Sequence, residues 1–430
     1  MAESSSSNLL DWTITDAPPA DEPLHSPDSS PSPRRTLTRD HHLSVLLWLL
    51  VGSLIAVVIA GLWMFSAYNT WRTRRDVMRV ATLEEKAAWA GDTRQYLQLS
   101  DDSNPDWVKS QTRLVENNQP APAPLPGLRP STQKTILQNV ESLTPDTVRV
   151  DVVRAFRTAD GTLLTFMLPQ FYRYTRGAWR RIPPPDIFWG ELQNRNGAHA
   201  RLRFYTADAP IMKEELGPYL DDVLARACAV WACPADLVVG INFANYAYQP
   251  DDSLMSSWFG ENVFLPSPHA QGLPADDAAK LQLKRTAAWR SLFALGDLVV
   301  RGDAGLGQPG SAFFHAFMAR TALQLGVITP HMETAPSAST LYTYTPIELW
   351  CAYCGAPITQ EQVDITRWEA EALLNELLRD QPTEKETALF QALSAASGPV
   401  SWVAKGLGIS PQEAQARLDA AFKRIQPALR

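Results

Sequence analysis

The sequence lacks the short motifs that identify most enzymes and cofactor-binding proteins. Its 430 residues contain no H-E-x-x-H, no G-x-S-x-G and no P-loop, and the G-x-G-x-x-G spacing of residues 305–310 does not follow a clear strand. None of its 7 histidines is paired with another at the i, i+4 spacing that lets one helix face bind zinc. We therefore expect no catalytic, cofactor-binding or metal-binding residues, and no cofactor.

An excess of positive charge is also missing. The chain has 39 Lys and Arg against 46 Asp and Glu, which gives a net charge of −7. This balance argues against a broad nucleic-acid surface, so nucleic acid is not an expected partner. The sequence has no Asn-x-Ser/Thr sequon, and so nothing indicates a glycosylated surface.

Charge is wholly absent from one long stretch, residues 43–68. This apolar run exceeds the roughly 20 residues that cross the ~30 Å hydrocarbon core of a bilayer. Trp48 lies near one end and Trp63 near the other, where amphipathic rings prefer the headgroup region. A cleavable signal peptide would start nearer the first residue. The sequence thus predicts a single-pass protein of the cell membrane, with the lipid bilayer as its partner.

The residues before and within the span carry weaker signals. Residues 1–42 are rich in Ser and Pro and predict a disordered tail, because they contain too little apolar surface to form a core. Within the span, Gly52, Ala56 and Ala60 have the small-xxx-small spacing that permits close helix packing, which raises the hypothesis of a homodimer or another protein partner. Arginines flank both ends of the span, so the positive-inside rule gives no clear orientation and leans slightly towards a cytoplasmic C-terminus.

The only four cysteines, Cys228, Cys233, Cys351 and Cys354, form two close pairs after the span. Such pairs suit two local disulfides in an oxidising compartment, although buried structural thiols are also compatible with the spacing. Cys351 and Cys354 have the C-x-x-C spacing of thiol–disulfide enzymes, but they lie late in the chain and outside a βαβ unit. We expect a structural disulfide or packed thiols here, and the placement of the cysteines favours C-terminal domains outside the cytoplasm.

The apolar pattern predicts an α+β protein. Helices are expected over residues 72–99, with a break at 91–92, and again from residue 105. From residue 135 the pattern alternates with period 2 between turn signals, which predicts an antiparallel sheet. Acidic doublets such as Glu84-Glu85 are expected to cap helices or face solvent, and give little reason to suspect acid–base catalysis.

Residues 72–190 resemble an NTF2-like cone domain. The resemblance rests on the helix-then-sheet order, on GDTRQYLQLSDDSNPDW at the helical end and on QFYRYTRGAWRRIPPPDIFWG where the sheet closes. The region is similar, more narrowly, to the membrane-proximal module of bacterial single-pass proteins that carry a gluzincin (peptidase MA-like) domain next. The resemblance implies a curved sheet with helices on one face.

Residues 198–430 resemble that peptidase MA-like domain through a strand–helix–strand start followed by long helices. Residues 275–302 occupy the place of the zinc-binding helix but contain no histidine, and His315 on the next helix is expected to be a core residue. The resemblance therefore implies a degenerate, non-catalytic domain. A Gly-rich loop at 302–312 lacks the lysine of a phosphate-binding loop.

The C-terminal residues 399–426 predict a helix pair, which is also the tail that the peptidase-like resemblance implies. The same pattern fits a DNA-binding helix-turn-helix, although the second helix starts without a basic residue. The leading hypothesis is a membrane-anchored, non-catalytic extracytoplasmic binding or scaffolding protein. The alternatives are a membrane-bound transcriptional regulator that uses residues 399–426 and a thiol–disulfide oxidoreductase that uses Cys351 and Cys354.

Overall fold

The structure is a computed structural model of the chain. It describes residues 40–117, 119, 121–132, 135–245, 258–259, 262–300, 309–328, 344–352, 354 and 360–426, with the backbone alone for 40–46, 258–259 and 360–361. Residues 1–39 of the predicted tail and most of the Gly-rich loop lie outside this description. The chain divides into two units, Met1–Asn69 and Thr70–Arg430.

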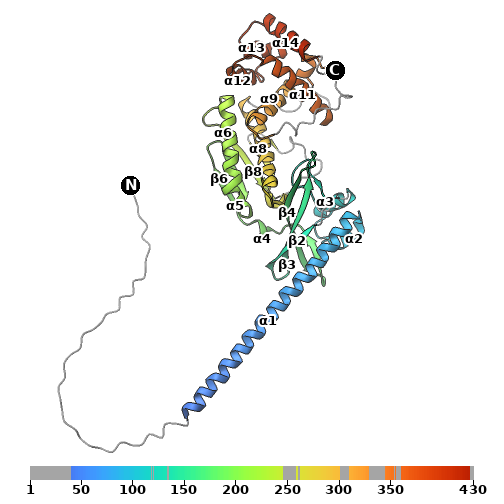
Figure 1. The fold of residues 1–430 in the computed structure, drawn as a ribbon, viewed down its shortest axis with the longest axis vertical. Helices are drawn as coiled ribbons and strands as arrows, with labels where there is room; N and C mark the ends of the chain where they lie inside the picture. The colour runs from blue at the N-terminus through green and yellow to red at the C-terminus, as the bar shows by residue number, and fades with distance from the viewer. Residues whose placement is uncertain are drawn as a thin grey trace, which may run out of the picture. The chain divides into compact units, whose positions relative to one another are not determined.

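A single helix, α1 (Asp40–Trp89), contains the predicted span and most of the helix predicted after it (Figure 1). The helix continues because no Gly or Pro occurs between residues 62 and 89. It is the one helix in the described part of the chain that is long and apolar enough to cross a bilayer. It ends just before the predicted break, where Gly91 has a φ of 66°.

The first sheet is antiparallel, as the period-2 pattern predicts. Its four consecutive strands are β2 (Ile136–Thr144), β3 (Thr147–Arg157), β4 (Leu163–Thr175) and β5 (Ala178–Ile182). Two short strands complete it: β1 (Arg129–Pro130) pairs with β3, and β11 (Leu273–Pro274) pairs with β4. Two helices precede it, α2 (Thr93–Gln98) and α3 (Pro105–Glu116).

The second sheet has a parallel centre and has the order β6-β7-β8-β10-β9. Its strands are β6 (Leu192–Asn196), β7 (Ala200–Tyr205), β8 (Val239–Ala244), β9 (Trp258–Phe259) and β10 (Asn262–Pro266). The helical segments around it are α4 (Asp186–Trp189), η1 (Thr206–Asp208), α5 (Ala209–Ile211), η2 (Met212–Leu216), α6 (Gly217–Trp231) and α7 (Pro268–Gln271). Because parallel neighbours need crossovers, α6 follows β7 and leads back to β8.

The remaining helices form the C-terminal part of the unit (Figure 1). They are α8 (Asp277–Val299), α9 (Ser311–Gln324), α10 (Pro346–Trp350), α11 (Gln360–Leu377), α12 (Thr383–Gln391), α13 (Pro399–Leu407) and α14 (Pro411–Ile425). Trp402 is fully buried and packs against Phe313, with ring centroids 4.5 Å apart. The predicted α+β class and helical C-terminus are confirmed.

Helix α8 connects the two parts of Thr70–Arg430. Its first turns place Ala279 and Leu283 against Phe156 and Phe166 of the first sheet, whereas its later residues join the core beneath the second sheet. Asp276, the N-cap of α8, also accepts a hydrogen bond from the backbone N–H of Thr165 at 2.8 Å. Residues after the predicted domain boundary at 190–198 thus pair with and pack on the first sheet. The boundary itself stays a prediction.

Candidate functional site

The last part of α1 directs the charged side chain of Glu84 towards the first sheet. Val77, Ala81, Glu84 and Ala88 follow one another at helical spacing on one face of α1, and all four are buried. Glu84 is only 3% exposed, so the expectation that this acidic doublet faces solvent is wrong for Glu84. The physical reason is its position on the apolar face, where the sheet supplies partners for the carboxylate.

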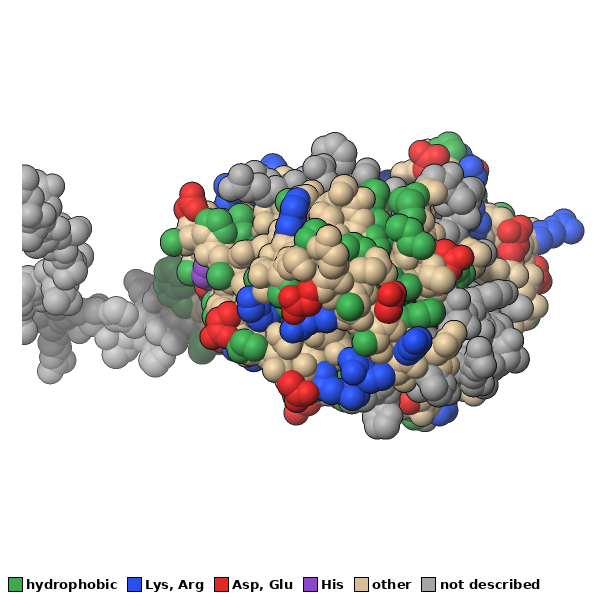
Figure 2. Space-filling view, turned by 90° about the horizontal axis from the view of Figure 1, so that it is seen from above, with side chains coloured by type: hydrophobic (Ala, Val, Ile, Leu, Met, Phe, Trp, Pro, Cys, Tyr) green, Lys and Arg blue, Asp and Glu red, His purple; other side chains and the backbone are tan. Residues whose placement is uncertain are grey.

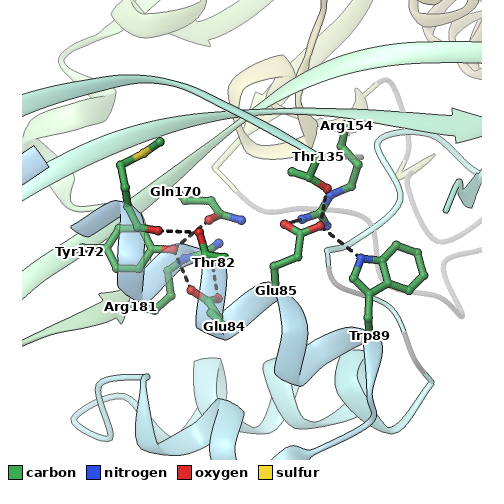
Figure 3. A network of polar contacts seen from close by, with 10 residues as sticks. Thr82, Glu84, Glu85, Trp89, Thr135, Arg154, Gln170, Tyr172 and Arg181 are labelled. Carbon is green, nitrogen blue, oxygen red and sulfur yellow. Dashed lines mark hydrogen bonds and ion pairs between the residues drawn. The ribbon is translucent and has the colours of Figure 1, made fainter. Parts of the chain in front are cut away.

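Glu84 is held by two side chains of the sheet, Arg181 and Tyr172 (Figure 3). Its Oε1 lies 2.8 Å from Nη1 of Arg181, and its Oε2 accepts a hydrogen bond from the hydroxyl of Tyr172 at 2.7 Å. The same hydroxyl lies 2.9 Å from the amide oxygen of Gln170. Burial, followed by the charge of Glu84, raises the pKa of Tyr172. Burial opposes the charge on Arg181, but Glu84, Tyr172 and Tyr96 together outweigh burial and raise the pKa of the guanidinium.

The neighbouring Glu85 makes a second ion pair, to Arg154 of β3 at 2.9 Å (Figure 3). Glu85 also accepts hydrogen bonds from the indole N–H of Trp89, at 3.1 Å, and from the hydroxyl of Thr135. Arg154 is 2% exposed, and burial lowers its pKa. Arg154 continues the inward-facing series of Val148, Val150 and Val152, so the strand period itself indicated a buried arginine.

A cavity of about 350 Å³ opens between α3 and the β4–β5 part of the sheet. Its walls include Asn104, Trp107, Ser110, Gln111, Phe171 and Arg181. The position of Arg181 is fixed by Glu84, and Gln111 accepts a hydrogen bond from the hydroxyl of buried Tyr96 at 2.9 Å. The volume lies at the lower end of the range of small-molecule sites, about 300–1,000 Å³. The lining offers two aromatic faces together with amide, hydroxyl and guanidinium groups and the carboxylate of Asp106.

The cysteines lie in the two pairs that the sequence indicates. Cys228 and Cys233 are at disulfide-bonding distance, with Cα atoms 4.8 Å apart, and Cys351 and Cys354 likewise, at 5.0 Å. Cys351 is the C-cap of α10, so it meets the negative end of a short helix. Redox enzymes instead stabilise their thiolate at a helix N-terminus, and this position therefore disfavours a thiol–disulfide enzyme.

His269 and His315 have separate surroundings in the structure. Burial, followed by the charge of Arg367, lowers the pKa of His315 to about 3, as expected for a core residue. His269 Nδ1 lies 2.8 Å from buried Asp208, and the hydroxyl of Ser267 donates to the same Asp208 oxygen, so these three do not form a nucleophilic triad. No group of three or more His, Cys, Asp or Glu side chains in the described ranges is arranged to bind a metal.

The C-terminal helix pair has the predicted bounds, but three of its four cations are engaged within the protein. Arg417 lies 3.5 Å from Glu413, Arg424 pairs with Glu376, and Lys405 donates to the carbonyl of Ala395, whereas Lys423 is exposed. Figure 2 shows this end of the unit, where acidic and basic side chains are interspersed with apolar ones. A DNA-binding helix needs free cations for phosphates, so this arrangement disfavours the regulator.

Searches of protein-family models, curated proteins and solved structures find no match to this chain.

The Glu84 pair generates a stability prediction. In Glu84→Gln, Arg181 stays buried without a compensating charge, and removal of one partner of a buried pair costs about 3–5 kcal/mol. We expect the free energy of unfolding of the full chain in detergent to fall by this amount in urea titrations. Exposed Glu214 provides the control, since Glu214→Gln should change stability by less than about 0.5 kcal/mol. A Glu84→Gln protein as stable as the wild type would contradict the account.

Glu369 on α11 generates a prediction about pH. Burial raises its pKa to about 7, against an opposing hydrogen bond from the backbone N–H of Tyr344. A raised carboxyl pKa means that the folded state holds the proton, so this stabilisation is complete below the unfolded pKa of about 4.3 and is lost as pH rises towards 7. The wild type should lose stability between pH 5 and pH 7.5, measured by urea titration.

Glu369→Gln should remove this part of the pH dependence. Glu384 is exposed on α12, so Glu384→Gln serves as the control and should keep the wild-type slope. An identical slope in the wild type and in Glu369→Gln would show that Glu369 titrates as an ordinary carboxyl.

Proposed function

We propose that this chain is a membrane-anchored, non-catalytic binding protein whose domains after the span lie outside the cytoplasm. The observation that carries the proposal is the cavity beside α3, because its lining combines aromatic faces with a guanidinium held in place by a buried carboxylate. Sites that bind small molecules are typically concave and preformed, with a few polar groups fixed in place. The ligand class that fits is a small molecule with an aromatic or aliphatic body and one acceptor group for Arg181.

The finer fold assignment is part of this proposal. The order of helices and then an antiparallel sheet supports an NTF2-like module over residues 72–190, and α8 and α9 after a mixed sheet support a degenerate peptidase MA-like domain over 198–430. In such a domain α8 would be the former metal-binding helix. Because α8 contains no histidine, the domain in this proposal offers surfaces for binding and does not use this helix as a zinc site.

The orientation in the membrane is supported by the cysteines. Local disulfides persist in oxidising compartments, and both pairs belong to Thr70–Arg430. Contact between two spans through Gly52, Ala56 and Ala60 remains part of the proposal, as does a protein partner of the second domain.

The cavity is tested by filling it. Ser110→Trp places an indole in the cavity wall, and we expect it to abolish binding of small aromatic carboxylates that bind the wild type. Ligand-observed NMR with a library of such compounds and of uncharged aromatics measures this directly. The full chain in detergent is used, with detergent alone as the blank.

Ser103→Trp is the matched control, because Ser103 is exposed in the loop before α3 and does not line the cavity. It should bind the same compounds as the wild type. If no compound distinguishes the wild type from Ser110→Trp while both melt at the same temperature, the cavity is not a binding site.

A further inference from the structure

Arginine is concentrated where the unit Thr70–Arg430 begins. Four arginines lie on α1 directly after the predicted span, and three more lie on the β4–β5 hairpin beside Arg181, which is paired with Glu84. We call this set the arginine rim, and it consists of Arg72, Arg74, Arg75, Arg79, Arg173, Arg176 and Arg180.

The two groups of arginines lie at the same end of the first sheet. Val77 of α1 packs in one apolar cluster with Val148 and Tyr172, and Trp179 packs against that cluster from β5. In the hairpin, Arg173 is paired with Arg180 across the two strands. Arg74 also donates to the carbonyl of Gln138 on β2 at 3.4 Å. Both groups of the rim therefore belong to the packed assembly of α1 and the first sheet.

Acidic residues at this end only partly compensate the charge. Arg72 and Arg75 share Asp76, at 3.8 and 3.4 Å. Segments 72–79, 136–149 and 172–180 contain eight arginines and three acidic residues, a net charge of +5 in a chain whose total is −7. The other two acids are Glu141, paired with Arg149 at 3.1 Å, and Asp146, which accepts hydrogen bonds from Thr144 and Thr147.

Aromatic side chains accompany the arginines. Trp71 is 55% exposed with the Arg75 guanidinium 4.8 Å from its ring centroid, and Tyr174 is 50% exposed beside Trp179. Tryptophan and tyrosine with neighbouring arginine are the residues enriched where proteins meet the headgroup region of a bilayer.

We propose that the arginine rim binds the phosphates of anionic lipid headgroups, so that the first sheet is docked on the surface of the bilayer that holds the span. The inference rests on the proposed membrane anchorage. Chain continuity selects the bilayer over other polyanions, because Arg72 follows the predicted span, 43–68, by about one helical turn. Juxtamembrane basic segments are attracted to anionic lipids within a Debye length, about 10 Å at 0.1 M salt.

The test uses the full chain with a nitroxide label on Ala178→Cys, the exposed first residue of β5, since the four native cysteines are paired. The protein is placed in nanodiscs of phosphatidylcholine with or without phosphatidylglycerol, each containing a lipid with a nickel chelate on its headgroup. We expect nickel to broaden the nitroxide spectrum in the phosphatidylglycerol discs. The broadening should be lost in about 1 M salt, where the Debye length is about 3 Å.

Charge-reversal variants distinguish binding by the arginine rim from a general attraction between the protein and anionic lipids. Arg173→Glu with Arg176→Glu should abolish the broadening, whereas Arg201→Glu with Arg203→Glu, two exposed positions on β7, should leave it unchanged. Equal broadening in both lipids, or the same loss in both double variants, would overturn the proposal. Failure of the chain to remain with the discs would instead contradict the membrane anchorage itself.

Discussion

Two adjacent carboxylates on one helix determine how the first part of the unit is assembled. A buried carboxylate is costly unless a cation and hydrogen bonds compensate it, and Glu84 and Glu85 each find an arginine on the sheet. These pairs require α1 to lie in one register against β3 and β5, because neither arginine can be satisfied elsewhere without leaving a charge unpaired. Arg181 is thereby fixed in the cavity wall, so the same interaction that positions the helix also prepares the proposed site.

The sequence predicts where the helices and strands lie better than it predicts which strands and which side chains pair. The period-2 alternation from residue 135 gives β2 to β5, and the Gly91 break and the C-terminal helix pair appear where expected. The pairing of β11 with β4 is missed, because two residues ending in Pro274 carry no alternation. The buried carboxylates are missed because Glu84 and Arg181 are 97 residues apart, although the inward position of Arg154 was readable from the strand period.

The second part of the unit shows why a motif alone is a weak guide to chemistry. Cys351 and Cys354 have the spacing of a redox site, yet they follow a helix whose dipole disfavours a thiolate. The C-terminal pair has the pattern of a DNA-binding motif, yet Arg417 and Arg424 are engaged with carboxylates. In both places the surrounding electrostatics favour a structural role, which agrees with a tethered binding protein.

The membrane topology tests the account most directly. A reporter enzyme that is active only outside the cytoplasm, fused after Arg430, measures it in living cells. The account predicts an active reporter, with the cysteines of Thr70–Arg430 in an oxidising compartment. An inactive fusion, with a second reporter that works only in the cytoplasm active at the same position, would contradict the account. That result would remove the physical basis for the two disulfides. It would also make residues 399–426 the first place to look for function.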